Sequence, residues 1–328
     1  INSKKSSILG PFKHSKTQEF YVTKSFTSNN SYQKEKNALQ LLEHPNIIKL
    51  VESDLCPHHL QLQTNNINLV YYQGGDLFTW SDSNLVFEEK HARTIFRQIL
   101  NALIFSKNKT FYHNGAKCHG IFHCDLKPEN IMMNHGIPYI IDWGLAYYKS
   151  SHRKNYYTLS GTDSYRSPQK IWNPIYDHEK NDVWSLGIIL FNFLIKLSPY
   201  KIKVSGTNFE PDHWLKLILT KQWNHFWYYM IDNIVLQKLK IQSPAKDVNI
   251  LIKYINNGHI NKPVFLQDYK CLFNQFFRNL IQNMLNPDEN ERFSFEEVSN
   301  HPWFKGEFSS TSELIRLEKL IKIQCLKR

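Results

Sequence analysis

The sequence predicts an α+β fold in which a strand-rich first part is followed by a mainly helical remainder. Three observations support this prediction. The chain has 328 residues, 41% of them hydrophobic and 14% aromatic, which is enough to form a sizeable core. The first third contains short segments rich in β-branched and aromatic residues. From Glu88 onward, apolar residues recur at helical spacing.

The elements of the first part follow from local patterns. Glu19–Phe26 and Ile67–Tyr72 are rich in β-branched and aromatic residues and are predicted to be strands. Between them, Tyr32–Leu42 carries a helical apolar stripe, which His44-Pro45-Asn46 ends. Gly74-Gly75 is predicted to be a hinge between the two parts, because two consecutive glycines interrupt both patterns.

Helices dominate the second part. One begins at Glu88, and four further helices are predicted over Asp182–Lys196, Trp214–Thr220, Tyr269–Leu285 and Ser312–Lys327. The last of these is an amphipathic basic helix, for which packing or a solvated end is the plain interpretation and a membrane-surface or partner role the alternative.

Two stretches have the character of insertions. Residues 106–116 are polar and are expected to be turn-like. Residues 201–258 hold a cluster of aromatic side chains, which we interpret as local core; if the cluster is exposed, it is a candidate partner site. Its members are Trp214, Trp223, Phe226, Trp227, Tyr228 and Tyr229.

Charge and cysteine content narrow the function classes. The formal net charge is +11, but the 32 lysines are dispersed and the 8 arginines form no stripe, so we expect no nucleic-acid binding. The five cysteines include no CxxC pair, which indicates a reducing, cytoplasmic compartment. No apolar run suffices for a transmembrane helix. Because the chain begins at Ile1 without Met, we expect an excised piece of a longer protein.

The strongest chemical signal is the segment His123–Asn130, followed by Asp142-Trp143-Gly144. Asp125, Lys127, Asn130 and Asp142 suit phosphoryl transfer. One carboxylate orients a hydroxyl nucleophile, and a lysine neutralises charge on the transferred group. An amide and a second carboxylate hold Mg²⁺. A polar turn beside a hairpin is the plain alternative, but it would need this spacing to arise by chance.

These motifs resemble the eukaryotic protein kinases, and the resemblance extends over about Ile8–Phe304. Tyr21–Lys24 is similar to the strand that carries the family's nucleotide-binding lysine, and Glu35 lies where the αC helix supplies the partner of that lysine. The resemblance implies a two-lobed α+β protein kinase fold. The later matching motifs are Gly161–Gln169, Asp182–Gly187, Arg292 and His301–Phe304.

The resemblance also implies the roles of individual residues. Asp125 would act on the substrate hydroxyl, and Lys127 would contact the γ-phosphate. Asn130 and Asp142 would bind Mg²⁺, or Mn²⁺, and Lys24 paired with Glu35 would grip the α- and β-phosphates of ATP. The nucleotide-binding set is Lys24, Glu35, Leu9, Val22, Asn130 and Asp142. The regulatory spine of the family would pass through Leu39, Leu50, Trp143 and His123.

The substrate is predicted to be a protein with an acceptor serine or threonine. Lys127 together with Thr162 resembles the serine/threonine subgroup of the family. Asp76 and Glu129 match acidic positions that read a basic residue upstream of the target in basophilic kinases, although both are equally well explained as ordinary surface acids. We expect a monomeric catalytic domain with lobes over 1–73 and 74–306 and a helical tail over 307–328.

Several positions depart from the family pattern. In an alignment without a gap before Lys24, Asn2, Lys4 and Ser7 stand where the family has the glycines of its phosphate-covering loop, which disfavours close approach of the backbone to phosphate. A frayed strand that truncation leaves misaligned is the alternative interpretation of this end. The alternative function is therefore a pseudokinase that acts as a scaffold or allosteric partner. Cys124 stands in place of the arginine that meets a phosphorylated activation segment, so activity is predicted not to depend on phosphorylation of Thr158.

Two further departures concern packing. Trp143 replaces a phenylalanine, and its indole N–H is expected to help hold the segment in its active position. Gln169 replaces a glutamate that pairs with Arg292, which predicts a softer anchor.

A zinc site is the rival interpretation of the histidines and cysteines near the motif. Cys118-His119, His123-Cys124 and His113 have ligand side chains, as has the segment Cys56–His59. Their spacing is unusual for four tetrahedral ligands, so the kinase interpretation is preferred.

Overall fold

The computed structural model describes residues 6–14, 17–51, 65–150, 161–173, 175–205, 208–232 and 271–326. The chain divides into two compact units. Unit 1 combines Ile1–Ser83, Arg97–Gly161 and Ser310–Arg328, and unit 2 combines Asn84–Phe96 with Thr162–Ser309. The predicted domain boundaries after residues 73 and 306 stay predictions.

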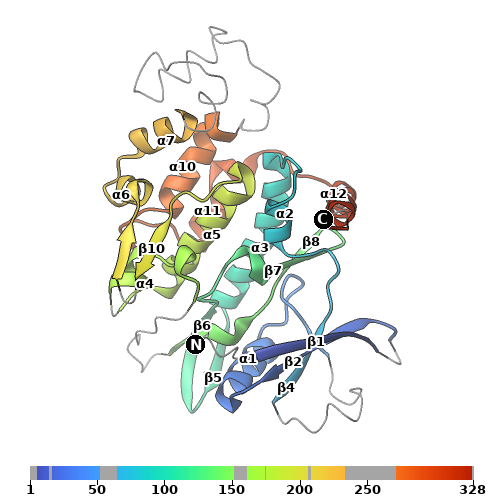
Figure 1. Ribbon diagram of the computed structural model, residues 1–328. Helices are drawn as coiled ribbons and strands as arrows, with labels where there is room; N and C mark the ends of the chain where they lie inside the picture. Colours follow the sequence, from blue (N-terminus) through green and yellow to red (C-terminus); the bar gives the residue numbers. More distant parts are fainter. Residues whose placement is uncertain are drawn as a thin grey trace. The chain divides into compact units, whose positions relative to one another are not determined.

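A four-stranded sheet forms the first layer of unit 1, shown in blue in Figure 1. Its strand order is β1-β2-β4-β3, and all the pairs are antiparallel. Along β2, Tyr21, Thr23 and Lys24 are buried, and Lys24 lies opposite Ile67. The bounds are β1 Ser6–Lys13, β2 Phe20–Phe26, β3 Leu50–Val51 and β4 Asn66–Val70.

Helix α1, Asn29–Leu41, packs beside this sheet. Its buried residues Glu35, Ala38 and Leu39 lie three and four positions apart, so they share one face of the helix. Leu42 caps the helix and is itself buried, which agrees with the predicted stop before His44. This face carries a carboxylate into a largely apolar layer, and that requires a cationic partner.

The segment expected to be turn-like at residues 106–116 is largely a hairpin, which corrects the prediction. Strand β5, Thr110–His113, pairs with β6, Ala116–Phe122, across a two-residue turn. Asn114 and Gly115 both have positive φ, the conformation of a type I′ turn, whose twist matches that of the flanking strands. The Asn-Gly signal was present in the sequence. Strand β9, Tyr147–Ser150, pairs with the other edge of β6.

A second hairpin of unit 1 joins β7, Ile131–Asn134, to β8, Ile137–Ile140. Single helical turns flank it: η3, Pro128–Asn130, comes before β7, and η4, Trp143–Leu145, comes after β8. Because Ile131 lies opposite Ile140, the residues just outside the hairpin meet at its open end.

The chain's last helix, α12, Thr311–Cys325, closes on this hairpin at the opposite end. Glu318 is only 4% exposed, and its Oε2 accepts the N–H of Gly136 in the β7–β8 turn at 2.8 Å. Lys322 lies 3.0 Å from the other carboxylate oxygen. The described part of the predicted tail is therefore a packed helix.

Unit 2 is mainly helical. Helix α5, His178–Ile195, is buried almost throughout and forms its centre. Asp177 caps its first turn by accepting the N–H of Lys180. The other elements are η5 Asp163–Tyr165, α4 Pro168–Trp172, β10 Ile202–Ser205, β11 Asn208–Pro211, α6 His213–Leu219, α7 Trp223–Ile231, α10 Gln275–Met284, α11 Phe295–Asn300 and η8 Pro302–Lys305.

The aromatic cluster predicted within 201–258 is largely core. Phe226 and Trp227 are 0% and 1% exposed, and both rings lie about 6.1 Å from Phe191 of α5. Only Tyr229 at the rim is classed as exposed among the six aromatics. Residues 233–258 of this stretch lie outside the described residues.

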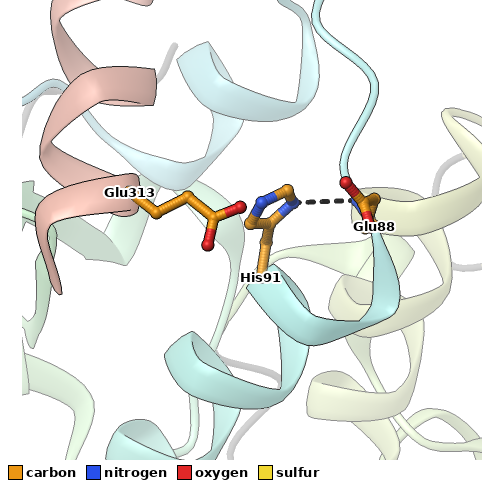
Figure 2. Close-up of side chains that lie close together, drawn as sticks. All are labelled: Glu88, His91 and Glu313. Atoms are coloured by element: carbon orange, nitrogen blue, oxygen red, sulfur yellow. Dashed lines mark hydrogen bonds between the residues drawn. The ribbon is translucent and has the colours of Figure 1, made fainter. Parts of the chain in front are cut away.

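Helix α3, Glu89–Lys107, begins in unit 2 and continues in unit 1. At its start the N–H of Glu88 donates to His91 Nδ1 at 2.9 Å (Figure 2). A side chain in the first turn thus satisfies a backbone donor before the helix, as in a capping box.

The predicted α+β class is confirmed, with the four-stranded sheet in the first third and most of the described helices after Glu88. Helix α2, Leu77–Ser81, follows the two glycines directly. No helix within the described ranges is long and apolar enough to cross a membrane.

Candidate active site

A buried ammonium group lies between two carboxylates in unit 1. Lys24 Nζ is 2.7 and 2.8 Å from the two carboxylate oxygens of Glu35. It is also 2.8 Å from Asp142 Oδ1. The three side chains come from strand β2, helix α1 and the residue just before η4, so the packing of α1 on both elements brings them together. With one positive and two negative charges, the cluster has room for a further cation.

Burial and charge act against each other in this cluster. Burial alone would lower the pKa of Lys24, but the charges of Asp142 and Glu35 outweigh it and raise that pKa. Burial raises the pKa of Glu35 to about 7, since it outweighs the opposing effect of Lys24, and the nearby Asp142 charge adds to the rise. For Asp142, burial is overcome by Lys24, and its pKa is lowered. Asp142 therefore stays charged at neutral pH.

The backbone around Asp142 is shaped for close approach. Asp142 has φ 59° and ψ 65°, in the left-handed region. A Cβ on Gly144 would lie 3.0 Å from Glu35 Oε2 and 3.3 Å from Asp142 Oδ1, so a larger residue would press on both carboxylates. The absence of a side chain at Gly144 therefore allows helix α1 and the segment after Asp142 to pack closely.

Trp143 is fully buried, and its ring lies 4.9 Å from that of His123. The His123 ring bridges two segments: its Nε2 lies 2.9 Å from the Ile141 carbonyl oxygen, and its Nδ1 accepts the Asp125 N–H at 3.2 Å. The indole N–H has no acceptor among the described residues. The expected hydrogen bond is therefore not found there, and Trp143 acts through packing.

The segment after β6 holds Asp125, Lys127 and Asn130 together. Lys127 Nζ lies 3.5 Å from Asp125 Oδ2. Asn130 Nδ2 donates to the Asp125 carbonyl oxygen at 2.8 Å, and it lies 3.4 Å from Asp125 Oδ2. The single turn η3 places the lysine and the amide on the same side of the aspartate, because a tight turn brings positions two and five apart close together.

Asn130 and Asp142 fit a divalent cation. They flank the β7–β8 hairpin at its open end, where the Ile141 N–H donates to the Asn130 carbonyl oxygen at 2.9 Å. Asn130 uses its amide nitrogen toward Asp125, and no described donor engages its Oδ1. The Asp142 side chain is 44% exposed. Amide and carboxylate oxygens are the ligands that Mg²⁺ prefers.

Two further predicted nucleotide-binding residues lie on the sheet of unit 1. Leu9 on β1 is 44% exposed and pairs with Thr23. Val22 on β2 is half-buried and lies opposite Leu69. Val22 lies two residues before Lys24, so the two side chains share one face of the sheet and Val22 adjoins the charged cluster. Leu9 lies opposite Thr23, so its side chain is on the other face of the sheet, away from that cluster.

Asp76 and Glu129, the predicted substrate-reading acids, lie on neighbouring elements because α2 packs on η3. Asp76 has a structural role as well: its Oδ1 accepts the N–H of Thr79 at 2.7 Å and caps α2. Glu129 is exposed on η3. Thr162 belongs to unit 2, where its carbonyl accepts the Tyr165 N–H.

The structure describes only some of the positions that depart from the family pattern. Ser7, at the third glycine position, is part of β1 and pairs with Ser25, whereas Asn2, Lys4 and Thr158 lie outside the described residues. Cys124 is 4% exposed, has φ 65°, and its Sγ lies 3.6 Å from the Phe122 carbonyl oxygen.

The anchor around Arg292 lies in unit 2. Arg292 Nη2 donates to Gln169 Oε1 at 2.7 Å, and the other guanidinium nitrogens donate to the carbonyl oxygens of Asn286 and Lys180. Gln169 Nε2 donates to the Pro287 carbonyl oxygen. The predicted neutral pair is present, and the amide makes a second bond that a glutamate could not donate.

The zinc interpretation finds no support in the described part of the chain. Cys118 Sγ and Cys124 Sγ each point to a nearby carbonyl oxygen, and His123 serves the backbone. None of these residues belongs to a described group of three metal ligands. The segment Cys56–His59 lies outside the described residues.

Comparison with known proteins identifies the family. The family model "Protein kinase domain" matches residues 9–304. The chain belongs to the protein kinase family. The predicted protein kinase fold is thereby confirmed, since the antiparallel sheet with α1 and the helical remainder are the parts of this domain.

Individual relatives of this kinase domain are named as protein kinases, and some of them as serine/threonine kinases. CBL-interacting protein kinase 5 of Oryza sativa subsp. japonica is 26% identical over 279 residues, which are 83% of this chain and 45% of that protein. The probable serine/threonine-protein kinase MARK-A of Dictyostelium discoideum is 28% identical over 288 residues, 86% of this chain and 20% of the relative. The chain thus spans less than half the length of these relatives.

A third relative, CBL-interacting serine/threonine-protein kinase 15 of Arabidopsis thaliana, is 34% identical over 173 residues, 51% of this chain and 37% of the relative. The printed names of this relative and of MARK-A are those of serine/threonine kinases.

Sequence reasoning missed one buried charge that packs on the hairpin beside this kinase site. Glu318 on α12 is buried against the turn of the hairpin whose open end carries Asn130 and Asp142. An acidic residue at a buried helical position between Leu314 and Ile321 was the available signal.

Proposed function

We propose that this domain catalyses transfer of the γ-phosphoryl group of ATP to serine or threonine hydroxyls of proteins. The observation that carries the proposal is the bridge from Lys24 to both Glu35 and Asp142, with Asp142 at the open end of the hairpin that follows Asn130. Burying a lysine with two carboxylates costs folding free energy, and such a cluster is typical of a site that binds phosphates and cations.

Asp125 is the proposed group that orients the hydroxyl and accepts its proton. Lys127, 3.5 Å from the Asp125 carboxylate, is placed to neutralise charge on the transferred group. Lys24 grips the α- and β-phosphates, and Glu35 fixes the position of its ammonium group. Rate enhancement then comes from positioning and from fixed charges.

Asn130 and Asp142 would hold Mg²⁺, and Mn²⁺ has the same ligand preferences for this role. The cation supplies charge neutralisation on the phosphate oxygens when bound. Val22 offers an apolar contact on the same face of the sheet as the phosphate-binding lysine, and a nucleotide base would lie against it.

The proposed substrates carry a basic residue upstream of the acceptor hydroxyl. Asp76 and Glu129 on the packed elements α2 and η3 support this, since together they present two negative charges. Thr162 completes the serine/threonine pattern with Lys127. On a peptide array, Glu129→Gln should weaken the preference for Arg or Lys, while the exposed control Glu43→Gln should leave it intact. A preference for acidic or proline-directed peptides in the parent protein would refute this part.

Turnover is proposed not to require a phosphate on Thr158. Cys124, at the position of the family's phosphate-binding arginine, is buried and neutral. Ser31 and Tyr147, at two other partner positions, carry no positive charge either. Thr158→Ala should retain activity; a folded Thr158→Ala protein without turnover would contradict this.

The decisive experiment compares the parent protein with Asp125→Asn in a radiolabelled phosphate-transfer assay. The variant should lose at least about a hundredfold in rate, because it cannot accept the proton. Thermal shift with Mg·ATP is the control, since nucleotide binding should persist in the variant. Equal, low labelling of both proteins would favour the scaffold alternative, and a missing thermal shift as well would indicate an empty pocket.

A further inference from the structure

A pocket in unit 2 is separate from every residue assigned to phosphoryl transfer. It has a volume of about 560 Å³ and lies among helix α7, the first turns of α10 and the start of η8 (labels α7 and α10 in Figure 1). Trp227 and Phe277 hold α7 against α10, with ring centroids 6.4 Å apart. Its principal lining residues are Trp227, Phe276, Arg278, Asn279, Gln282 and His301.

Arg278 lines this pocket without a counter-charge. Its Nε is buried, and no described residue accepts a hydrogen bond from it. No acidic side chain of the described segments forms an ion pair with its guanidinium. Burial lowers the pKa of Arg278, although an arginine keeps its proton in proteins. An uncompensated, largely buried guanidinium has a free-energy cost that a bound anion would offset.

Trp227 supplies a second donor without an acceptor. The residue is 1% exposed, and its Nε1 has no hydrogen-bond partner among the described residues. Buried indole N–H groups usually find an acceptor. Trp227 on α7 and Arg278 on α10, the residues that carry these two donors, both line one pocket.

The neighbouring polar groups add a third donor. The Trp303 N–H donates to His301 Nδ1 at 3.2 Å, so the ring proton is on Nε2, which lies 3.0 Å from Asn279 Oδ1. With its oxygen engaged, Asn279 is left with its amide N–H groups for a ligand. Burial lowers the pKa of His301, which keeps this ring neutral at neutral pH.

The charge of the pocket sets the charge of its ligand. Arg278 is the sole formally charged residue among the lining residues that the structure describes, so these residues give the site a single positive charge. A planar guanidinium matches a carboxylate, which bears one negative charge, whereas a phosphate near charge −2 would be only half compensated.

We propose that this pocket binds a carboxylate presented by an acidic side chain of a partner protein. A volume of about 560 Å³ exceeds what a carboxylate fills, and the ring of Phe276 is 56% exposed, so the pocket accepts the flanking peptide as well. The site is independent of the proposed phosphoryl transfer, since none of its residues belongs to that machinery.

The test follows the indole N–H of Trp227 by nuclear magnetic resonance in the whole chain, with Trp227→Phe identifying the signal. The probes are N-acetyl-glutamate-methylamide, its glutamine analogue, its phosphoserine analogue and acetate. We expect a saturable shift with the glutamate probe, a weaker response to acetate, and none with the glutamine analogue.

Arg278→Gln should weaken the glutamate response by about tenfold or more, because it removes a charge-assisted hydrogen bond. Arg316→Gln, which removes an exposed arginine from α12, is the matched control and should not change it. Arg278→Lys keeps the charge without the planar fork and should retain part of the glutamate response. A partial response in this variant would show that the loss in Arg278→Gln is not caused by unfolding.

Three results would overturn the proposal. They are an equal response to the glutamine analogue, tighter binding of the phosphoserine probe than of the glutamate probe, and an unchanged response in a folded Arg278→Gln variant.

Discussion

Two buried cations of this protein are balanced in different ways. Lys24 in unit 1 lies within 2.8 Å of two carboxylates, whereas Arg292 in unit 2 meets a neutral amide and two backbone carbonyl oxygens. The pKa of Lys24 is raised despite its burial, while burial lowers that of Arg292 to about 10. Direct ion pairs compensate the first cation. Hydrogen-bonding dipoles hold the second, and the more distant carboxylates of Glu289, Asp177 and Asp288 add to their effect.

This difference distinguishes a site that takes part in the reaction from one that stabilises the fold. A cluster with an excess carboxylate suits a site that exchanges cations and phosphates, because its charge balance changes on binding. A guanidinium that donates to three acceptors and stacks 4.9 Å from the Trp184 ring centroid joins segments distant in sequence. We therefore expect substitutions at the first site to affect rate, and those at the second to affect stability.

The largest effect is expected for Lys24→Met. Loss of the phosphate-gripping charge should reduce phosphoryl transfer by about a hundredfold to a thousandfold. Stability should change little, because Glu35, with a pKa of about 7, can take up a proton once its partner is lost. Rate assays and urea unfolding measure the two quantities. A large drop in the free energy of unfolding would contradict the expectation that substitutions at the Lys24 site affect mainly the rate.

Arg292→Met should have the opposite profile. It leaves the buried oxygens of Asn286, Lys180 and Gln169 without a donor, at a cost of about 3 kcal/mol in the free energy of unfolding. Urea denaturation tests this, with the exposed Arg316→Met as a control expected within about 0.5 kcal/mol. An effect no larger than the control would mean that dipoles around Arg292 contribute little.

The pH dependence of the Lys24 cluster gives a third test. As pH falls below about 7, Glu35 takes up a proton, weakens its hold on Lys24, and kcat/KM for ATP should fall by up to about tenfold per pH unit. Glu35→Gln should lower the rate at high pH and remove this acid limb. If the Glu35→Gln variant lost activity over the same acidic pH range, the pH dependence would belong to another group.

The same group affects stability in the opposite direction. Because the pKa of Glu35 is raised from 4.5 by folding, its contribution to stability is fully present below about pH 4.5 and is lost as pH rises through about 7. Activity and the Glu35 contribution to stability should thus move oppositely over this range, which unfolding measurements at several pH values can check.

Gln169→Glu should have the smallest effect, and it tests directly whether a charged or a neutral partner suits Arg292 better. The change gives Arg292 a charged partner but removes the donor to the Pro287 carbonyl oxygen and sets a carboxylate against it. We expect a net loss of about 1 kcal/mol in the free energy of unfolding. A gain in stability would show that the charged pair outweighs the amide's second hydrogen bond.

Much of the candidate site could be read from the sequence. Asp125, Lys127 and Asn130 are close in the chain, so a single tight turn brings them together and their spacing alone is informative. The helix through Glu35 and the strand through Lys24 also followed from local periodicity. The hairpin over Thr110–Phe122 was not predicted, because polar residues around its Asn-Gly turn obscure the strand pattern on either side.

The sequence by itself determined the family, the residue types of the phosphoryl-transfer site and most element positions, because these depend on near neighbours in the chain. Only the tertiary structure decided that Lys24 meets two carboxylates from separate elements, that Trp143 packs without a described hydrogen bond, and that Arg278 and Trp227 share a pocket. Burial and pairing across long sequence separations set these features, and no local pattern records them.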